Sequence, residues 1–252
     1  MKILISPAKS LDFESKLPQL DWSIPFFEKE AIQINSVLKK KSPKNLQKLM
    51  SISEKLAQLN WERNQYFGIS ENFQKRPAVF AFDGDVYSGL SVQSLSKDSI
   101  LIMQEKIRIL SGLYGLLRPL DQILPYRLEM GTYLKVGNHK NLYDFWKSKV
   151  TNVLQNELKT NEILVNLASA EYYGVVDIKT LNVPIVSPQF KDFNNGNLKM
   201  ISFFAKKARG MMARFLIEKE ANTLEDIKGF TSDGYVFSSE HTKNELEPVF
   251  IR

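Results

Sequence analysis

The sequence predicts a single α+β domain with a mixed sheet and surrounding helices. Short apolar runs typical of strands, such as 2–6 and 162–167, alternate with longer stretches of helical periodicity, such as 142–159. No repeat, low-complexity tract or linker-like change of composition divides the chain. Its 252 residues, 43% hydrophobic and 25% charged, have an ordinary globular composition and suffice for a sizeable core. We therefore expect one domain over 1–252.

The charge and cysteine content narrow the classes of partner and site. The net charge of +6 favours anionic partners. The absence of cysteine excludes disulfides and thiolate metal sites, and it fits a reducing cytoplasm. Only two histidines are present, so we expect neither a dedicated transition-metal site nor a cofactor, and direct iron binding is disfavoured.

No apolar run approaches the roughly 18 residues that a membrane-spanning helix needs. The apolar run at the N-terminus is also too short for a signal peptide. The sequence therefore predicts a cytoplasmic protein without a membrane partner.

The N-terminal segment predicts a strand followed by helices. The strand covers Lys2–Ser6 and is stopped by Pro7. Lys9 follows directly, and the end of a strand is a common place for functional groups in α/β proteins. A helix is expected from Pro25 to about Lys41, because its apolar residues recur at helical spacing.

Residues 43–67 predict two helices joined by a tight turn. Ser42 and Pro43 suit the start of the first helix, which extends to about Met50. Ser51 and Glu54 have the spacing of a capping box for a second helix that ends near Gly68.

The turn of this pair is similar to that of helix-hairpin-helix DNA-binding proteins. Its string LMSISEKLAQL (49–59) carries a small–apolar–small turn followed by Lys55. Such hairpins direct backbone N–H groups at a DNA phosphate, which makes Ser51, Ser53 and Lys55 candidate DNA contacts. Serines replace the usual turn glycines, and a plain helical hairpin is the alternative.

The middle of the chain carries a candidate pair of carboxylates. A strand is expected at 78–82, followed by Asp83-Gly84-Asp85. These carboxylates could bind a cation or act as acid and base, or they could simply form a turn. A helix is expected at 96–109.

Residues 110–131 cannot form one regular element, because three glycines and two prolines interrupt them. The segment holds polar groups among apolar ones, and such groups must find partners. They form either internal ion pairs or the polar floor of a site. They are Arg118, Asp121, Tyr126, Arg127 and Glu129.

The C-terminal half predicts alternating helices and strands. Asn141 suits the cap of a helix at 142–159, and Glu171 lies in a short helix or turn after the strand at 162–167. Asn-Gly at 195–196 predicts a hairpin between 189–193 and 198–204. The remaining elements are a strand at 183–187, a helix from Thr223 to Gly229, and strands at 235–237 and 249–251.

A basic helix is predicted at 205–218, after strand-like residues 201–204. Its cations fall within one arc of the helical wheel, and they are Lys206, Lys207, Arg209 and Arg214. Gly210 and Ala213 lie between them and would let a phosphate backbone approach closely. The alternative is an amphipathic surface helix with a solvated basic face.

Seven strings distributed along the chain together resemble the YaaA family, the bacterial peroxide stress-resistance proteins. They are SPAKSLD (6–12), FDGDVYSGL (82–90), LSGLYGLLRPLD (110–121), PYRLEMG (125–131), NLYDFW (141–146), NLASAEYY (166–173) and KKARGMMARF (206–215). The resemblance implies a cytosolic protein that protects cells from hydrogen peroxide and from damage by intracellular iron. It also implies an unusual α/β fold with a basic cleft and a helix-hairpin-helix element that binds DNA. Within it, Lys9, Lys55 and the four cations of 206–214 match the basic positions.

Two functions follow as expectations. The first is a monomeric protein that binds double-stranded or distorted DNA with little sequence preference, without catalysis. The second is a glycosylase-like enzyme acting on nucleic acid or nucleotides, with a carboxylate and a lysine in the cleft. Its candidate residues form no complete motif, and they are Lys9, Asp83, Asp85, Glu129 and Glu171.

Overall fold

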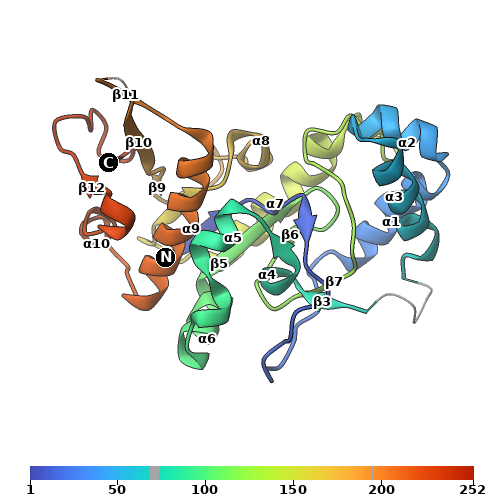
Figure 1. Cartoon of the computed structure of the whole chain (residues 1–252), viewed down its shortest axis with the longest axis horizontal. Coiled ribbons are helices and arrows are strands. Elements are labelled where there is room, and N and C mark those ends of the chain that lie inside the picture. The colour runs from blue at the N-terminus through green and yellow to red at the C-terminus, as the bar shows by residue number, and fades with distance from the viewer. Residues whose placement is uncertain (69–73, 195) are drawn as a thin grey trace.

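A five-stranded sheet lies at the centre of the computed structural model, which describes residues 1–68, 74–194 and 196–252 (Figure 1). Its strands, in spatial order, are β6 (Gly115–Leu117), β5 (Ile107–Ser111), β1 (Lys2–Ile5), β8 (Leu164–Leu167) and β9 (Ile185–Val186). β1 is parallel to β5 and β8, β8 is parallel to β9, and β6 is antiparallel to β5. The predicted mixed α/β fold with a mixed sheet is confirmed.

The central strand β1 determines where the loops of the sheet meet. Ile3, Leu4 and Ile5 are fully buried, as expected for a strand covered on both faces. Ile5 pairs with Ile109 of β5 and with Leu167 of β8. The carboxyl ends of these parallel strands therefore lie at one edge of the sheet, and the loops that follow β1 and β8 leave it side by side.

Several helices pack against this sheet. α6 (Lys97–Lys106) and α9 (Ser202–Glu218) contact β1, and α7 (Leu142–Glu157) contacts β6. The predicted cap of α7 is confirmed, because the Asn141 side chain accepts a hydrogen bond from the Asp144 backbone N–H. No helix in the described part of the chain is both long and apolar enough to cross a membrane.

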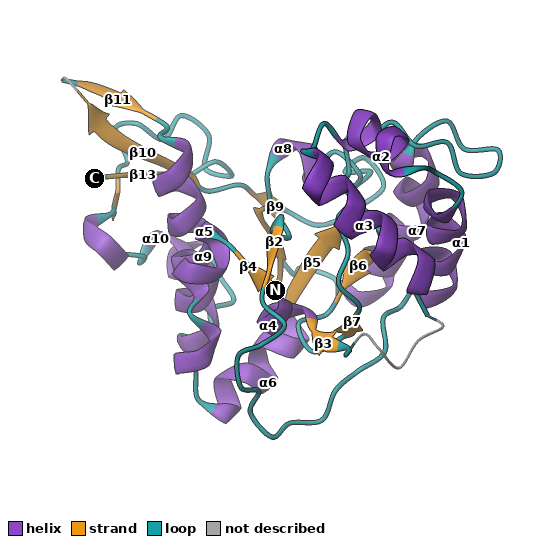
Figure 2. Ribbon diagram, turned by 45° about the vertical axis from the view of Figure 1, so that its right-hand side comes forward, coloured by secondary structure: helices purple, strands orange, loops and turns teal. Residues whose placement is uncertain are grey.

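Helices α1 (Glu28–Lys39), α2 (Pro43–Met50) and α3 (Glu54–Tyr66) form a cluster on the side of the molecule away from α9 (Figures 1 and 2). The predicted helical pair at 43–67 is confirmed, but the predicted capping box is wrong. Ser51 ends α2 in the left-handed conformation, with φ 51°. Ser53 instead caps α3, and its hydroxyl accepts a hydrogen bond from the Leu56 N–H.

A second sheet forms the C-terminal end of the fold. Its order is β11 (Asn197–Lys199), β10 (Gln189–Asn194), β13 (Val249–Ile251) and β12 (Val236–Phe237). β10 and β11 form the predicted antiparallel hairpin, although Asn195 in its turn lies outside the described residues. Buried aromatic rings pack against one another here, and they are Phe190, Phe230, Tyr235 and Phe250.

Short elements connect these layers. They are β2 (Ser10–Leu11), β3 (Arg76–Pro77), α4 (Ala78–Ala81), β4 (Phe82–Asp83), α5 (Asp85–Leu90), η1 (Val92–Ser94), β7 (Gln122–Ile123), α8 (Ala170–Tyr173), α10 (Leu224–Lys228) and η2 (Ser232–Gly234). β2 pairs with β4, and β3 pairs with β7. Thr223 and Asp226 form a complete capping box at the start of α10.

Three predicted elements differ from the structure. The strand at 78–82 is mostly the buried helix α4, because a short apolar run does not distinguish a buried strand from a buried helix. The helix at 96–109 ends at Lys106, and residues from Ile107 onward form the buried strand β5. The strand-like residues from Ser202 onward belong to α9, so the predicted hairpin strand is shorter than expected.

Candidate functional site

A cavity of about 400 Å³ opens at the edge of the sheet where β1 and β8 end. The loop after β1 and the region of α8 form one part of its wall, and the start of α5 and one face of α9 form the other. It is lined by Ser6, Pro7, Ala8, Lys9, Ser10, Asp83, Gly84, Asp85, Val86, Tyr87, Ser169, Glu171, Tyr172, Lys206 and Arg209. In open α/β sheets the carboxyl edge of parallel strands is the usual place for a ligand.

Hydrogen bonds hold the loops of this cavity in place. The Tyr87 hydroxyl donates to the Ser6 carbonyl oxygen at 3.1 Å, and the Ser169 N–H donates to the Ser6 hydroxyl at 2.9 Å. Ser10 pairs with Asp83 in the β2–β4 ladder. These contacts connect the segments that follow β1 and β8 and the segment before α5. Together with α9, the cavity wall is built from four distant parts of the chain.

Lys9 belongs to a short chain of charges beside the cavity. Its ammonium lies 2.8 Å from Glu129, and the other Glu129 oxygen lies 3.3 Å from the Arg127 guanidinium. Among the residues that the structure describes, Arg127 Nε is buried and has no hydrogen-bond partner. The segment 125–131 therefore brings an ion-paired Arg–Glu group to Lys9 beside the cavity.

Glu171 is fixed by the same segment. One oxygen of its carboxylate accepts a hydrogen bond from the Gly131 N–H at 2.9 Å. The Tyr143 hydroxyl donates to the Glu171 carbonyl oxygen at 2.8 Å. Glu171 is thus held in position by its neighbours.

Two buried tyrosines line the cavity. Burial raises the pKa of Tyr87 and of Tyr172 well above the usual range. Both phenols therefore stay neutral at physiological pH.

Four charged side chains of the cavity are unpaired in the part of the chain that the structure describes. Within residues 1–68, 74–194 and 196–252, no hydrogen bond or ion pair involves the side chains of Asp83, Asp85, Lys206 or Arg209. Burial lowers the pKa of Arg209. Unpaired charges of both signs in one hollow are available to a ligand.

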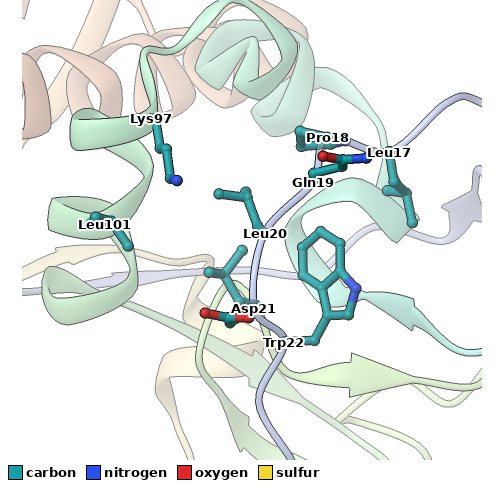
Figure 3. A pocket seen from close by; sticks show the side chains of 9 residues that line it. Leu17, Pro18, Gln19, Leu20, Asp21, Trp22, Lys97 and Leu101 are labelled. Atoms are coloured by element: carbon teal, nitrogen blue, oxygen red, sulfur yellow. The ribbon is translucent and has the colours of Figure 1, made fainter.

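A second, larger hollow of about 620 Å³ lies between α6 and the segment 17–22 (Figure 3). Figure 3 shows Lys97 and Leu101 on α6 opposite Leu20 and Asp21. The charged residues that line it are Asp21 and Lys97. It has fewer charged side chains that could bind a ligand than the cavity at the sheet edge.

The sequence that leads to the α2–α3 turn is rich in lysine. Residues 31–53 contain no acidic side chain. They contain the lysines Lys39, Lys40, Lys41, Lys44 and Lys48. Ser53 and Lys55, at the start of α3, are exposed.

Comparison with known proteins identifies the family. The sequence model described as "Peroxide stress protein YaaA" matches residues 1–241. The chain belongs to the YaaA family. It is 54% identical to a UPF0246 protein of Flavobacterium johnsoniae, 53% to one of Flavobacterium psychrophilum and 48% to one of Aliivibrio fischeri. Each alignment covers all of this chain and at least 98% of the relative.

The structure of this YaaA-family chain brings most of the predicted catalytic candidates together. Lys9, Asp83, Asp85 and Glu171 line the cavity, and Glu129 contacts Lys9. The described residues contain no group of three or more His, Asp or Glu side chains placed to hold a metal ion.

The predicted cleft residues are separated. Arg118 pairs with buried Asp121 at 2.9 Å and does not line the cavity. The Tyr126 hydroxyl lies 2.7 Å from the Ser111 hydroxyl in the interior. The alternative of an internal ion pair is therefore correct for Arg118.

The expected role of Gly210 in phosphate approach is wrong. Gly210 is buried against α5, and a Cβ there would collide with the Val86 carbonyl oxygen. Gly89 meets the backbone of Lys207 in the same way, and Ala213 is fully buried. The small residues allow two helices to approach closely, and they leave no access for a second molecule.

The four cations of α9 likewise do not form one surface. Arg214 donates to the Ser91 carbonyl oxygen at 3.0 Å and to the Ser94 hydroxyl at 2.7 Å, and it pairs with Glu218 at 2.7 Å. Lys207 lies 3.8 Å from Asp233. Of these four cations, Lys206 and Arg209 line the cavity. A DNA contact by Lys9, Lys206, Lys207 or Arg209 stays a prediction. The Arg214 guanidinium is already paired with groups of the protein itself.

Sequence reasoning missed several polar residues of the cavity, among them Ser6, Tyr87, Ser169 and Tyr172. Ser6 and Ser169 could have been found, because they lie at or just after the ends of the predicted strands at 2–6 and 162–167. If both strands are parallel neighbours, the residues that follow them must meet at one edge.

Proposed function

We propose that this protein binds double-stranded DNA, with little sequence preference, through the α2–α3 hairpin. The observation that carries the proposal is the acid-free, lysine-rich stretch 31–53 immediately before the exposed start of α3. Lysines neutralise phosphates without reading bases, so affinity depends on charge.

The geometry of the turn supports the same partner. Ile52 is buried between the helices, while Ser51 and Ser53 on either side of it are exposed. The first backbone N–H groups of a helix have no intrahelical partner and attract anions. A phosphate at the start of α3 would meet them together with Lys55.

This activity would connect the YaaA family's peroxide stress role to DNA, the molecule that peroxide and intracellular iron damage. On this proposal the protein acts as a monomer in the cytoplasm, where it has access to the chromosome.

Replacing lysines of the hairpin with uncharged glutamine tests the proposal. The triple variant Lys44→Gln, Lys48→Gln, Lys55→Gln should bind a random-sequence duplex more weakly than the native protein. The dependence of log affinity on log salt should become shallower by about 0.9 for each phosphate that the protein no longer neutralises.

The matched control is Lys179→Gln, Lys199→Gln, Lys219→Gln, which removes three exposed lysines without ion pairs in the described part of the chain. It changes the net charge equally but lies away from the hairpin. Equal weakening by the two triple variants would contradict hairpin binding.

We also propose, as a second candidate function, an enzyme acting on nucleic acid or nucleotides in the cavity. The observation that favours it is the meeting of Lys9 with Asp83, Asp85 and Glu171 at the carboxyl edge of β1 and β8. A lysine amine can attack a sugar carbon as nucleophile while a carboxylate moves the proton.

Base release from damaged or mismatched duplex, lost in Asp85→Asn, would support this function. Borohydride trapping of a covalent protein–DNA adduct, lost in Lys9→Ala, would identify the nucleophile. No base release and no adduct with the native protein would count against it.

A further inference from the structure

Two cations of the cavity lie about one helical turn apart on α9. Lys206 and Arg209 are three residues apart, so their side chains leave the same face of the helix. Within the described residues neither has an anionic partner. Arg209 is half-buried, and burying an unpaired guanidinium is costly. An anion with two or more oxygens could contact both side chains and compensate for that cost.

Two carboxylates share the same hollow. Asp83 and Asp85 lie on either side of Gly84, and neither is paired in the part of the chain that the structure describes. Gly84 packs against Ala8, with a Cβ at its position only 3.2 Å from the Ala8 Cβ. Ionised carboxylates only accept hydrogen bonds, so they bind hydroxyl or amine donors and repel phosphate.

The place of the cavity in the sheet narrows the class of ligand. β1 has β5 on one side and β8 on the other, and the next strand of this sheet lies towards the β6 edge after β1 but towards the β9 edge after β8, which makes the β1–β8 boundary a point where the strand order reverses. Such switch points bind nucleotides in open α/β sheets, and an acidic residue there often accepts hydrogen bonds from ribose hydroxyls. The cavity volume of about 400 Å³ lies in the range of small-ligand sites.

We propose that the cavity binds a free ribonucleoside monophosphate. Lys206 and Arg209 hold the phosphate, and Asp83 and Asp85 accept hydrogen bonds from the 2′- and 3′-hydroxyls of the ribose. The site is separate from the α2–α3 hairpin, and the inference does not rest on DNA binding. It shares its cavity with the second candidate function and narrows the ligand of that function without requiring catalysis.

Calorimetric titration of the native protein with the four ribonucleoside 5′-monophosphates tests the ligand class. At least one should bind. Its 2′,3′-dideoxy analogue should bind about tenfold more weakly, because hydrogen bonds to charged groups are lost. The nucleoside without phosphate should lose a similar factor of roughly ten. Binding that is unchanged by removal of the diol or of the phosphate would overturn the proposal, and so would the absence of binding by all four nucleotides.

Two variants test the orientation of the ligand. Arg209→Gln should weaken binding of the monophosphate about tenfold and leave binding of the nucleoside unchanged. Asp85→Asn should weaken binding of the ribonucleotide and leave binding of the dideoxy analogue unchanged. If Arg209→Gln weakened binding of the nucleoside, or Asp85→Asn weakened binding of the dideoxy analogue, the assignment of the phosphate to Arg209 and of the ribose to Asp85 would be wrong.

Lys219→Gln and Asp98→Asn are the matched controls, since both residues are exposed and lie outside the cavity. They should bind the ribonucleotide like the native protein. Thermal unfolding of all four variants shows whether each is folded at the temperature of the titration. Duplex affinity measured on the hairpin triple variant separates the two proposals, because that variant should keep its ribonucleotide affinity while it loses DNA.

Discussion

Gly89 and Gly210 let the backbones of α5 and α9 come into direct contact. Each position would place a Cβ against a carbonyl oxygen of the other helix, Lys207 for Gly89 and Val86 for Gly210. Arg214 adds hydrogen bonds from α9 to the residues that follow α5. These two glycines therefore determine the spacing between α5 and α9, which both line the cavity.

Replacing Gly210 with alanine should destabilise the protein by about 1–3 kcal/mol, because the new methyl group forces the helices apart. An alanine in an open helix interior would instead stabilise it. Chemical denaturation measures the change. Gly174→Ala is the comparison: a Cβ there comes no nearer than 3.3 Å to its neighbours, which is close but far less severe than at Gly210, so it should cost less stability. Equal stability of native protein and Gly210→Ala would contradict the close helix contact.

At the scale of elements, the segment after β2 is held by one carboxylate. Asp12 accepts hydrogen bonds from the N–H groups of Glu14 and Ser15, and it lies 3.7 Å from the Arg76 guanidinium. Hydrogen bonds from the Ser15 side chain and from these backbone groups lower the pKa of Asp12 to about 2. The charged form is thus favoured in the folded state.

The stabilisation by Asp12 should be lost in acid. A carboxyl whose folded pKa is below its unfolded value of about 3.9 stabilises the fold above that pH. The contribution disappears as pH falls from about 4 to 2. Because the group is partly exposed to water, we expect only about 1 kcal/mol. Asp12→Asn should lower the free energy of unfolding at pH 7 by this amount and be nearly neutral at pH 2. The same loss at both pH values would show that the charge is not responsible.

The hairpin offers a gain-of-affinity variant at the same scale. Glu54 is the acidic residue in the first turn of α3, next to the proposed phosphate site. Glu54→Gln removes a like-charge repulsion and should strengthen duplex binding about twofold to fivefold at low salt. Fluorescence anisotropy with labelled duplex measures it. Glu62→Gln, about two turns further along the same helix, should have little effect.

Capping residues explain which elements could be predicted from the sequence. Ser42, Asn141 and Thr223 make local hydrogen bonds, so their helices were predicted with nearly correct starts. The buried run at 78–81 carries no such local signal, because its conformation depends on its tertiary surroundings. The carboxylates of the site were predicted from their place after strands. The packing role of Gly210 was not, because it depends on a helix more than a hundred residues away.

At the scale of the whole molecule, α9 joins the two sheets. It contacts β1 and β8 of the central sheet and β10 of the second sheet, with Met212, Leu216 and Ile217 fully buried. The interior of each sheet therefore depends on the same helix. Separate unfolding of one sheet would expose the shared residues to water.

We accordingly expect the two sheets to unfold together. All three tryptophans precede residue 150 in the sequence, so their fluorescence reports on the central sheet and its helices. A fluorine label on Phe190, Phe230 and Phe250 reports on the second sheet. The two signals should change at the same urea concentration. Two separate midpoints would show that the sheets belong to independent folding units.

The contact between Gly89 and Gly210 also bears on selectivity. α5 begins at the two carboxylates of the cavity, and α9 carries the two cations, so a rigid contact between these helices keeps the opposite charges a constant length apart. A cavity of fixed length selects ligands by their length. We expect nucleoside di- and triphosphates to be rejected in favour of the monophosphate, so that the cavity would respond to the concentration of the shortest member of the series.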